Sequence, residues 1–301
     1  MIDFSVIVCT YNRSDYLTKV LSALNNQTFE GSRFEIILIN NNSTDETEKV
    51  CLNFQKNTPE LNITYFVESN KGLSYARNKG IELSNGNWII FLDDDAEPTS
   101  EYLDNIFNFI NDYPECIAAG GRIYPNYETS EPKWMSRFLL PLVSAIDLGN
   151  KIKKFPNNKY PIGANMIFRK DIFDKVGNFN VDLGRKGDQL LGGEEKEIFI
   201  KLRELTDEIY YIPTAIVYHF IPSKRLKLSF IKDMAQKIGE SNLIIYKKEN
   251  INRLRLNELF KWAASVILFL YYLIKFKGAQ GVMLLRFRFW VLQGILSSNN
   301  K

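Results

Sequence analysis

The sequence predicts an α/β fold with a mostly parallel central sheet, flanked by helices and followed by a C-terminal helical appendage. Short apolar runs at residues 4–10, 34–39, 63–67 and 88–92 alternate with stretches that have helical spacing. Such alternation is typical of a parallel sheet that is covered on both faces. Each run also ends in a polar cluster, and ligands of such sheets bind at the carboxyl ends of the strands.

Length and composition indicate a folded protein that contains one large domain. The chain has 301 residues, of which 45% are hydrophobic and 24% charged, so it can bury a substantial core. The formal net charge of +3 is too small to indicate a nucleic-acid partner, and we expect none. The cysteines, Cys9, Cys51 and Cys116, lie far apart and form no zinc or disulfide pattern. Together with an N-terminus that lacks a secretory signal, they predict a cytoplasmic protein.

The first apolar runs lead into polar loops that begin helices. Asn12 or Ser14 can cap a helix whose apolar positions continue to Leu24. The loop at residues 40–45 leads to a second helix, and a third begins near Gly72. No GxGxxG or P-loop turn follows a strand, so the sequence favours neither a dinucleotide-dependent dehydrogenase nor a P-loop kinase.

The fourth apolar run ends in three consecutive aspartates, Asp93, Asp94 and Asp95. Adjacent carboxylates repel one another and are poor strand formers, but a divalent ion would offset that cost. Mg²⁺ and Mn²⁺ prefer oxygen ligands, often one or two carboxylates together with substrate phosphates. The alternative is a solvated acidic turn before a helix that starts at residues 98–100. Because the triplet is the fourth polar strand end in a series, we favour a metal site.

The second half of the chain is less regular. Residues 125–161 mix aromatics, prolines and lysines, which is typical of an insertion that covers a substrate. A strand is predicted at residues 162–169 and a short helix at 170–176. Two further strands, at residues 209–213 and 215–219, complete the predicted core.

Two more groups in this half are candidates for chemistry. Glu194, Glu195 and Glu197 open an amphipathic helix, where the carboxylates either project from the mouth of the sheet or simply cap the helix. Their mutual proximity should raise at least one carboxyl pKa. His219 is the only histidine in the sequence. A lone histidine is more often structural, but its position after an apolar strand keeps a ligand role open.

The number and order of these motifs resemble glycosyltransferase family two, the inverting nucleotide-sugar transferases with the GT-A fold, over residues 4–225. Residues 6–13 and 40–45 resemble the family's nucleotide-binding motifs. Residues 70–80 match the segment before the metal-binding strand, and residues 93–95 match the DxD motif. Residues 163–166 resemble the acceptor-side strand, and residues 193–197 the segment that carries the catalytic base. Two positions depart from the family pattern. Asn40 stands where an aspartate commonly meets the uracil ring, and Glu195 stands where an aspartate often acts as the base.

This resemblance implies a metal-dependent inverting transfer from a nucleotide-diphosphate sugar to an acceptor hydroxyl, in surface polysaccharide or other glycan biosynthesis, with Mn²⁺ or Mg²⁺ as cofactor. It implies Glu195 as the catalytic base, with Glu194 as the alternative. The metal would be held by Asp95, Asp93 and His219. The nucleotide sugar would be bound by Thr10, Tyr11, Asn12, Arg13, Asn40, Asn42, Asn70, Gly72, Arg77, Asp93 and Asp94. The acceptor side would be formed by Gly163, Ala164 and Asn165.

The resemblance also implies a division into domains. Residues 1–225 would be the catalytic domain, with a nucleotide-binding half at 1–123 and an acceptor-binding half at 124–225, and residues 226–301 would be helical. One alternative is a catalytically inactive nucleotide-sugar-binding or membrane scaffold protein, which the retained acidic groups oppose. Another is a nucleotidyltransferase, which would usually have a phosphate-binding loop rich in glycine and lysine after the first strand; residues 11–14 do not form one.

The C-terminal region suggests a membrane surface. Residues 262–274 are almost wholly apolar but fall short of the roughly 20 residues that span a bilayer, although flanking lysines can snorkel and keep spanning open. Residues 282–292 interleave arginine with large apolar groups, as interfacial helices do. The alternative is a helical hairpin packed on the catalytic domain or on a second copy in a homo-oligomer. A membrane seat would place the protein at the inner face of the cell membrane and would suit a lipid-linked acceptor.

Overall fold

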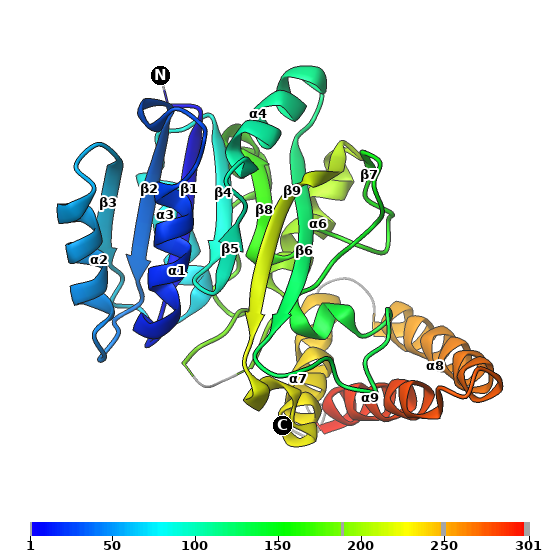
Figure 1. Cartoon of the computed structure of the whole chain (residues 1–301). Coiled ribbons are helices and arrows are strands. Elements are labelled where there is room, and N and C mark those ends of the chain that lie inside the picture. The colour runs from blue at the N-terminus through cyan, green and yellow to red at the C-terminus, as the bar shows by residue number, and fades with distance from the viewer. Residues whose placement is uncertain (1, 188–189, 248–250, 298–301) are drawn as a thin grey trace. The chain divides into compact units, whose positions relative to one another are not determined.

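A computed structural model describes residues 2–187, 190–247 and 251–297 (Figure 1). The chain divides into two compact units, which we describe separately. Unit 1 comprises Met1–Asn126, Ser144–Asp182 and Glu194–Phe220, and unit 2 comprises Tyr127–Val143, Leu183–Gly193 and Ile221–Lys301.

Unit 1 is built on a single mixed sheet. Its strands are β1 (Phe4–Thr10), β2 (Phe34–Asn40), β3 (Asn62–Val67), β4 (Trp88–Asp93), β5 (Ala96–Pro98), β6 (Ala118–Tyr127), β7 (Lys153–Lys154), β8 (Met166–Arg169) and β9 (Ile209–Ile221). They lie in the order β3-β2-β1-β4-β8-β6-β9-β5, with β7 paired to β9. The first four in this order are mutually parallel, whereas β8 runs antiparallel to both β4 and β6.

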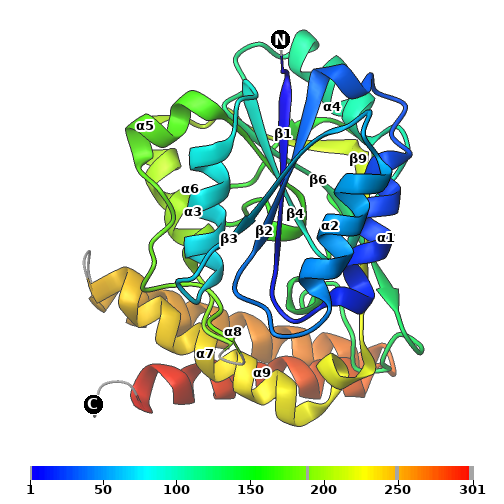
Figure 2. The same ribbon diagram turned by 90° about the vertical axis from the view of Figure 1, so that its left-hand side faces the viewer.

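Helices cover both faces of this sheet. The α-helices of unit 1 are α1 (Ser14–Asn25), α2 (Thr47–Asn57), α3 (Leu73–Leu83), α4 (Tyr102–Asp112), α5 (Phe173–Val176) and α6 (Glu194–Leu205). Its short 3₁₀ helices are η1 (Gly31–Arg33), η3 (Gly163–Asn165) and η4 (Lys170–Ile172). Figure 2 shows α1 and α2 on one face of the sheet and α3, α5 and α6 on the other. The predicted fold class, a largely parallel sheet flanked by helices, is confirmed.

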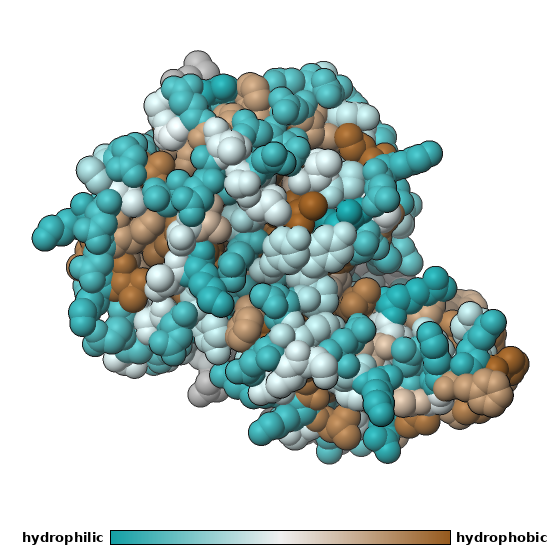
Figure 3. Space-filling model, viewed as in Figure 1, coloured by the Kyte–Doolittle hydropathy of each residue, from teal (hydrophilic) through white to brown (hydrophobic). Residues whose placement is uncertain are grey.

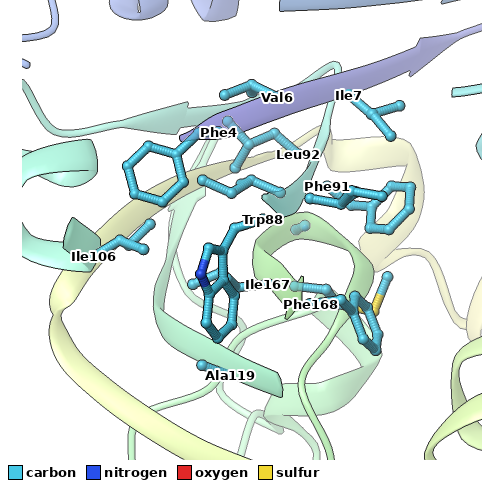
Figure 4. Packing of buried hydrophobic residues seen from close by; sticks show 14 of the residues in the cluster. Phe4, Val6, Ile7, Trp88, Phe91, Leu92, Ile106, Ala119, Ile167 and Phe168 are labelled. Carbon is cyan, nitrogen blue, oxygen red and sulfur yellow. The ribbon is translucent and has the colours of Figure 1, made fainter. Parts of the chain in front are cut away.

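The core forms where the apolar strands meet. Seven residues of β2 and six of the seven in β1 are buried, as expected for strands covered on both faces. Figure 4 shows Phe4, Val6 and Ile7 of β1 packed with side chains of β4 and β8. Each such side chain stabilises the fold by about 1.5–3 kcal/mol on burial. This packing fixes the register of β1 against β4, in which Cys9 lies opposite Asp93.

Two local predictions for unit 1 were wrong, and one alternative also differs from the structure. The strand expected at residues 162–169 is limited to β8, because the Asn165 N–H donates to the Ile162 carbonyl (2.7 Å) and closes the turn η3. The two strands expected at 209–213 and 215–219 form a single strand, β9, since the fixed φ of Pro213 is compatible with extended backbone. The helix considered at residues 98–100 begins later, at Tyr102, because β5 pairs with β9 first.

Unit 2 consists mainly of three long helices, α7 (Leu228–Lys247), α8 (Ile251–Ile274) and α9 (Gly278–Ser297), with the 3₁₀ helices η2 (Leu140–Val143) and η5 (Ser223–Leu226). Glycines allow α7 and α9 to cross closely. A Cβ on Gly294 would collide with the Gln236 backbone, and one on Gly239 would collide with the Val291 carbonyl. Helix α9 also packs along α8, where Gly281 contacts Phe269.

Helix α8 carries a longer apolar segment than the sequence pattern indicated. Leu256–Ile274, 19 residues, is long and apolar enough to cross a membrane, and it is the only such segment within the described ranges. The apolar stretch predicted at residues 262–274 is thus the C-terminal part of a longer segment, and spanning, which the sequence left open, stays a prediction. The segment extends past Lys261 because that lysine pairs with Glu258 on the same helix, while Leu256, Leu259 and Phe260 add apolar surface.

Candidate active site

The carboxyl ends of the parallel strands bring the predicted polar clusters to one edge of the sheet. In the β1–β2 register Thr10 lies opposite Asn40, and the Asn41 N–H donates to the Thr10 carbonyl (2.9 Å). The Glu68 N–H donates in turn to the Asn40 carbonyl (2.9 Å). Strand β4 ends beside β1 and delivers the aspartates to the same edge. Adjacent parallel strands thus gather groups that are far apart in the sequence.

Two asparagines in left-handed backbone shape the loops after β1 and β2. Asn12 has φ 51° and Asn42 has φ 60°, a region that asparagine tolerates better than most residues. The Asn12 N–H donates to the Ser43 hydroxyl (2.9 Å), and its side-chain oxygen accepts from the Thr44 N–H (2.7 Å). Tyr11, which precedes Asn12 in the chain, is half-buried. The two loops are therefore held together as one surface.

Asn40 and Asn70 are also fixed by hydrogen bonds. The Asn40 side chain donates to the Tyr65 hydroxyl (2.9 Å) and accepts from the Ser43 N–H (2.9 Å). The Asn70 amide and its backbone N–H both donate to one oxygen of Glu68 (2.8 Å each). Both asparagines thus have well-defined positions at the edge of the sheet.

Sequence reasoning missed the residue that ties these loops together, Asn41. Its buried side chain donates to the carbonyls of Glu68 (3.1 Å) and Asn70 (2.7 Å) and accepts from the Gly72 N–H (2.7 Å). Gly72 has φ 144°, which favours glycine, and it precedes helix α3. The three successive asparagines were a signal, but the pattern alone did not tell which of them faces inward.

The predicted metal ligands lie together. Asp93, Asp95 and His219 each offer a ligand atom, and these atoms lie within 4.8 Å of one another. The pairing of β5 with β9 brings His219 opposite Ala96, which places its Nε2 3.0 Å from Asp95 Oδ1. His219 and Asp95 are both about 1% exposed at the side chain, so this is a buried polar site rather than a solvated turn. Carboxylate oxygens with one imidazole nitrogen fit Mn²⁺, and the carboxylates fit Mg²⁺.

Arg13 supplies positive charge to this acidic group. Its guanidinium pairs with Asp94 (3.3 Å) and Asp95, and it stacks over the Tyr16 ring at 4.8 Å. Burial raises the pKa of Asp94 to about 7, against the lowering effect of Arg13 and with the help of Asp95. Buried carboxylates this close together require a neighbouring cation, and Arg13 provides one.

Arg77 connects the aspartates with the glutamates of α6. Its Nη1 lies 2.9 Å from Glu194 Oε1, and its Nη2 lies 3.2 Å from Glu195 Oε1 and 3.7 Å from Asp93 Oδ1. The guanidinium is about 2% exposed and packs against the rings of Phe91 and Phe179. The two acidic groups, about a hundred residues apart in the sequence, thus share one fixed cation.

Glu194 and Glu195 differ in their surroundings. The Glu194 side chain is about 5% exposed, whereas that of Glu195 is 21% exposed. Glu195 Oε1 accepts from the Gly163 N–H (2.9 Å). Burial, helped by the charges of Glu194 and Asp93, raises the pKa of Glu195 to about 7 against the lowering effect of Arg77. A carboxylate with such a pKa can take up a proton near neutral pH.

The three residues predicted for the acceptor side make different contacts. Gly163 lies against Arg77 and Glu195, and Ala164 is fully buried. The Asn165 side chain accepts from the Tyr102 hydroxyl (2.7 Å) and donates to the Ala215 carbonyl (3.0 Å), so it joins three elements of the core. A role for these residues in acceptor binding stays a prediction.

Gly163→Ala should disturb this geometry without unfolding the protein. A Cβ at Gly163 would collide with the ends of the Arg77 and Glu195 side chains, which can move, and not with backbone. Since a displacement of about 1 Å can cost ~100-fold in rate, we expect kcat to fall at least tenfold. Gly278→Ala, where a Cβ would make only ordinary contacts, is the matched control. Equal turnover in both variants would contradict a role for the Gly163 contact.

The sequence of this chain matches the sequence model of "Glycosyl transferase family 2" over residues 5–177. The chain belongs to glycosyltransferase family 2. It is therefore a glycosyl-transfer enzyme.

Relatives of this family 2 glycosyltransferase take part in glycan synthesis. It is similar to a glucosyl-dolichyl phosphate glucuronosyltransferase of Haloferax volcanii, with 26% identity over 233 residues that cover 75% of this chain and 72% of the relative. It is also similar to a GalNAc(5)-diNAcBac-PP-undecaprenol beta-1,3-glucosyltransferase of Campylobacter jejuni, with 36% identity over 110 residues, which cover 36% of this chain and 34% of the relative. The matched part is thus about a third of the latter protein.

Solved structures confirm the GT-A fold of this family 2 glycosyltransferase. The mannosyltransferase PcManGT of Pyrobaculum calidifontis, in complex with GDP-Man and Mn²⁺, aligns with a TM-score of 0.66 at 16% identity, over 98% of this chain and 87% of that one. Residues 1–349 of Staphylococcus aureus TarS, in complex with UDP-GlcNAc, align with a TM-score of 0.59 at 17% identity, over 99% of this chain and 92% of that one. At these identities the likeness concerns the fold.

Proposed function

We propose that this family 2 glycosyltransferase is metal-dependent and inverting, and that it moves a sugar from a nucleotide-diphosphate donor to an acceptor hydroxyl in surface polysaccharide or other glycan synthesis. One observation carries the proposal: the Arg77 guanidinium lies within 3.7 Å of an acid from the metal cluster and of two acids from α6. The groups that would hold the leaving group and the groups that would remove the proton thus share one fixed cation. The Mn²⁺ and GDP-Man of the PcManGT complex support a metal and a nucleotide sugar.

Asp93, Asp95 and His219 would hold Mn²⁺ or Mg²⁺ in this proposal. Such an ion, when bound, neutralises the charge that develops on the departing nucleotide diphosphate. Asp95 is fixed by its neighbour His219, whereas Asp93 is half-buried and closer to solvent. Asp94 faces Arg13, so its role is to keep that arginine beside the diphosphate site.

The loops after β1, β2 and β3 would bind the nucleotide. The loop residues concerned are eight of the eleven predicted from the sequence, Thr10, Tyr11, Asn12, Arg13, Asn40, Asn42, Asn70 and Gly72; the other three are Arg77, Asp93 and Asp94. The hydrogen bonds between these loops support this assignment: Asn12 accepts from the Thr44 N–H in the loop after β2, and Asn41 accepts from the Gly72 N–H. A preformed surface of this kind costs little ordering on binding.

Glu195 would act as the general base. Its partly exposed carboxylate can reach an acceptor hydroxyl, remove the proton and leave the oxygen free to attack the anomeric carbon from the face opposite the diphosphate. Glu194 is buried, and its Oε1 anchors Arg77 Nη1. We assign it the positioning of Arg77, which in turn orients Glu195.

The acceptor would be a glycan or a lipid-linked saccharide, as in the names of the Haloferax and Campylobacter relatives. Residues 1–225 would form the catalytic domain, and residues 226–301 the helical region that keeps the enzyme in the cytoplasm at the inner face of the membrane. The buried Gly163 turn, whose N–H donates to Glu195, would border the acceptor site.

The test is a panel of nucleotide sugars incubated with the protein and Mn²⁺, with release of nucleotide diphosphate as the readout. We expect one donor to be hydrolysed slowly, and no release in the presence of EDTA or in Asp95→Asn. A nucleotidyltransferase would instead release pyrophosphate from a nucleoside triphosphate. A scaffold protein would bind a nucleotide sugar and release nothing over the whole panel.

A further inference from the structure

Helix α8 presents an uncovered apolar face. Within Leu256–Ile274 only 17% of the residues are buried, although the segment is apolar enough for a membrane. The large exposed side chains are Leu256, Leu259, Phe260, Val266, Ile267, Leu270, Tyr271, Leu273 and Ile274, followed by Phe276. Figure 3 shows apolar side chains gathered at the end of unit 2 where Figure 1 places α8. Soluble monomers rarely expose an apolar patch of this extent.

The opposite face of α8 is already used. Leu254 and Tyr272 are buried, and Phe269 lies against Gly281 of α9. Because α9 carries Arg286 and Arg288, carrying the α8–α9 pair across a bilayer would place two arginines in hydrocarbon. A helix with one packed face and one apolar exposed face instead suits the boundary between headgroups and acyl chains.

A cationic cavity adjoins the C-terminal end of this face. It has a volume of about 480 Å³ and is lined by Glu131, Met135, Ser136, Arg137, Leu140, Tyr271, Tyr272, Lys275, Lys277 and Gln280. Arg137, Lys275 and Lys277 oppose a single acid, Glu131, and within the described part of the chain none of these three cations forms an ion pair. The first turn of the long helix α9, which includes Gln280, adds its positive end.

We propose that unit 2 binds an anionic membrane surface, with the exposed face of α8 in the acyl boundary and the phosphate of a membrane phospholipid in the cavity formed by Arg137, Lys275 and Lys277. Tyr271 belongs to both the apolar face and the cavity lining, so one lipid can satisfy both. The phosphate of the lipid headgroup pairs with the three cations, while the acyl chains of the lipid extend along the apolar side chains of α8. The proposal does not depend on the donor or the base of the transfer reaction.

Co-sedimentation with vesicles tests this assignment. The wild-type full chain should bind phosphatidylglycerol vesicles much more strongly than phosphatidylcholine vesicles, and high salt should weaken the binding. Neutralising the cavity with Arg137→Gln, Lys275→Gln and Lys277→Gln should lower the partition coefficient between roughly tenfold and a hundredfold, since each cation near an anionic surface is worth about fivefold. Millimolar glycerol phosphate should compete only if the cavity holds the headgroup phosphate.

The matched control replaces Lys224, Lys227 and Lys232, three exposed lysines of unit 2 outside the cavity, by glutamine. An equal loss in both triple variants would mean diffuse attraction and would overturn the cavity site. Ile267→Ser with Leu270→Ser should weaken binding while the thermal unfolding temperature stays close to wild type. Resistance of the membrane-bound protein to alkaline carbonate would indicate spanning, and a lipid-free dimer whose formation requires Ile267 and Leu270 would indicate a second copy. Either result would overturn the proposal.

Discussion

Glu195→Gln is expected to abolish glycosyl transfer while nucleotide binding persists. The amide keeps the shape of the side chain, but it cannot accept the proton of the attacking hydroxyl. General bases contribute about 10²–10⁴-fold, so kcat should fall by at least about 100-fold. The measurement is turnover with the donor that the nucleotide-sugar panel identifies, together with calorimetric binding of the nucleotide diphosphate. The matched control, Glu204→Gln, alters an exposed acid on the same helix and should leave both values unchanged.

The same carboxylate predicts how activity depends on pH. Burial and its acidic neighbours raise the pKa of Glu195 from 4.5 to about 7, and only the deprotonated form can act as a base. Below that pKa the rate should therefore fall as protons bind, so kcat/KM should rise with pH through about 7 and then level off. Unchanged turnover in Glu195→Gln, with the same acid limb as wild type, would remove Glu195 from this role.

Arg77→Met is expected to have the largest effect on stability. It removes the cation that faces Glu194, Glu195 and Asp93, and it leaves the buried Glu194 carboxylate without its ionic partner. Breaking a buried pair in this way costs about 3–5 kcal/mol. Urea denaturation should show that loss in the free energy of unfolding, and transfer should fall with it.

Arg77→Lys and Arg169→Met separate the possible causes. Lysine restores the charge but not the planar fork, so Arg77→Lys should regain part of the stability and little of the activity. Arg169 pairs with Asp171 near the surface, and Arg169→Met should cost about 1 kcal/mol or less. If Arg77→Met were as stable and as active as Arg169→Met, Arg77 would not connect the two acidic groups functionally.

Local sequence patterns were enough to predict the first half of the fold. Strands β1 and β2 and the helices that follow them have strong periodicity, and polar residues stand where each strand ends. The aspartates and the glutamates could be found because acids in those positions are costly without a partner. His219 could be suspected as a ligand, and its distance from Asp95 now supports that suspicion.

Other features depend on tertiary contacts that no local pattern encodes. The antiparallel direction of β8 and the continuation of β9 through Pro213 result from pairing with distant strands. Arg77 was expected to reach a phosphate or an acid of the aspartate triplet, and it does lie 3.7 Å from Asp93. Its partners on α6, more than a hundred residues away, were not expected. The acceptor-side role of Gly163 stays a prediction, and no local pattern indicated that its lack of a Cβ makes room for Arg77 and Glu195.

The most direct test of the central claim is the stabilisation of the protein by a nucleotide sugar with and without Mn²⁺. If Asp93, Asp95 and His219 hold the ion that the diphosphate requires, the donor at 100 times its Kd should stabilise the wild-type protein by about 2.7 kcal/mol with Mn²⁺. The same donor concentration should stabilise the protein far less in EDTA. In Asp95→Asn, the donor should give the same small stabilisation with Mn²⁺ as with EDTA. Equal stabilisation with Mn²⁺ and with EDTA, in both wild type and Asp95→Asn, would contradict a metal-dependent donor site.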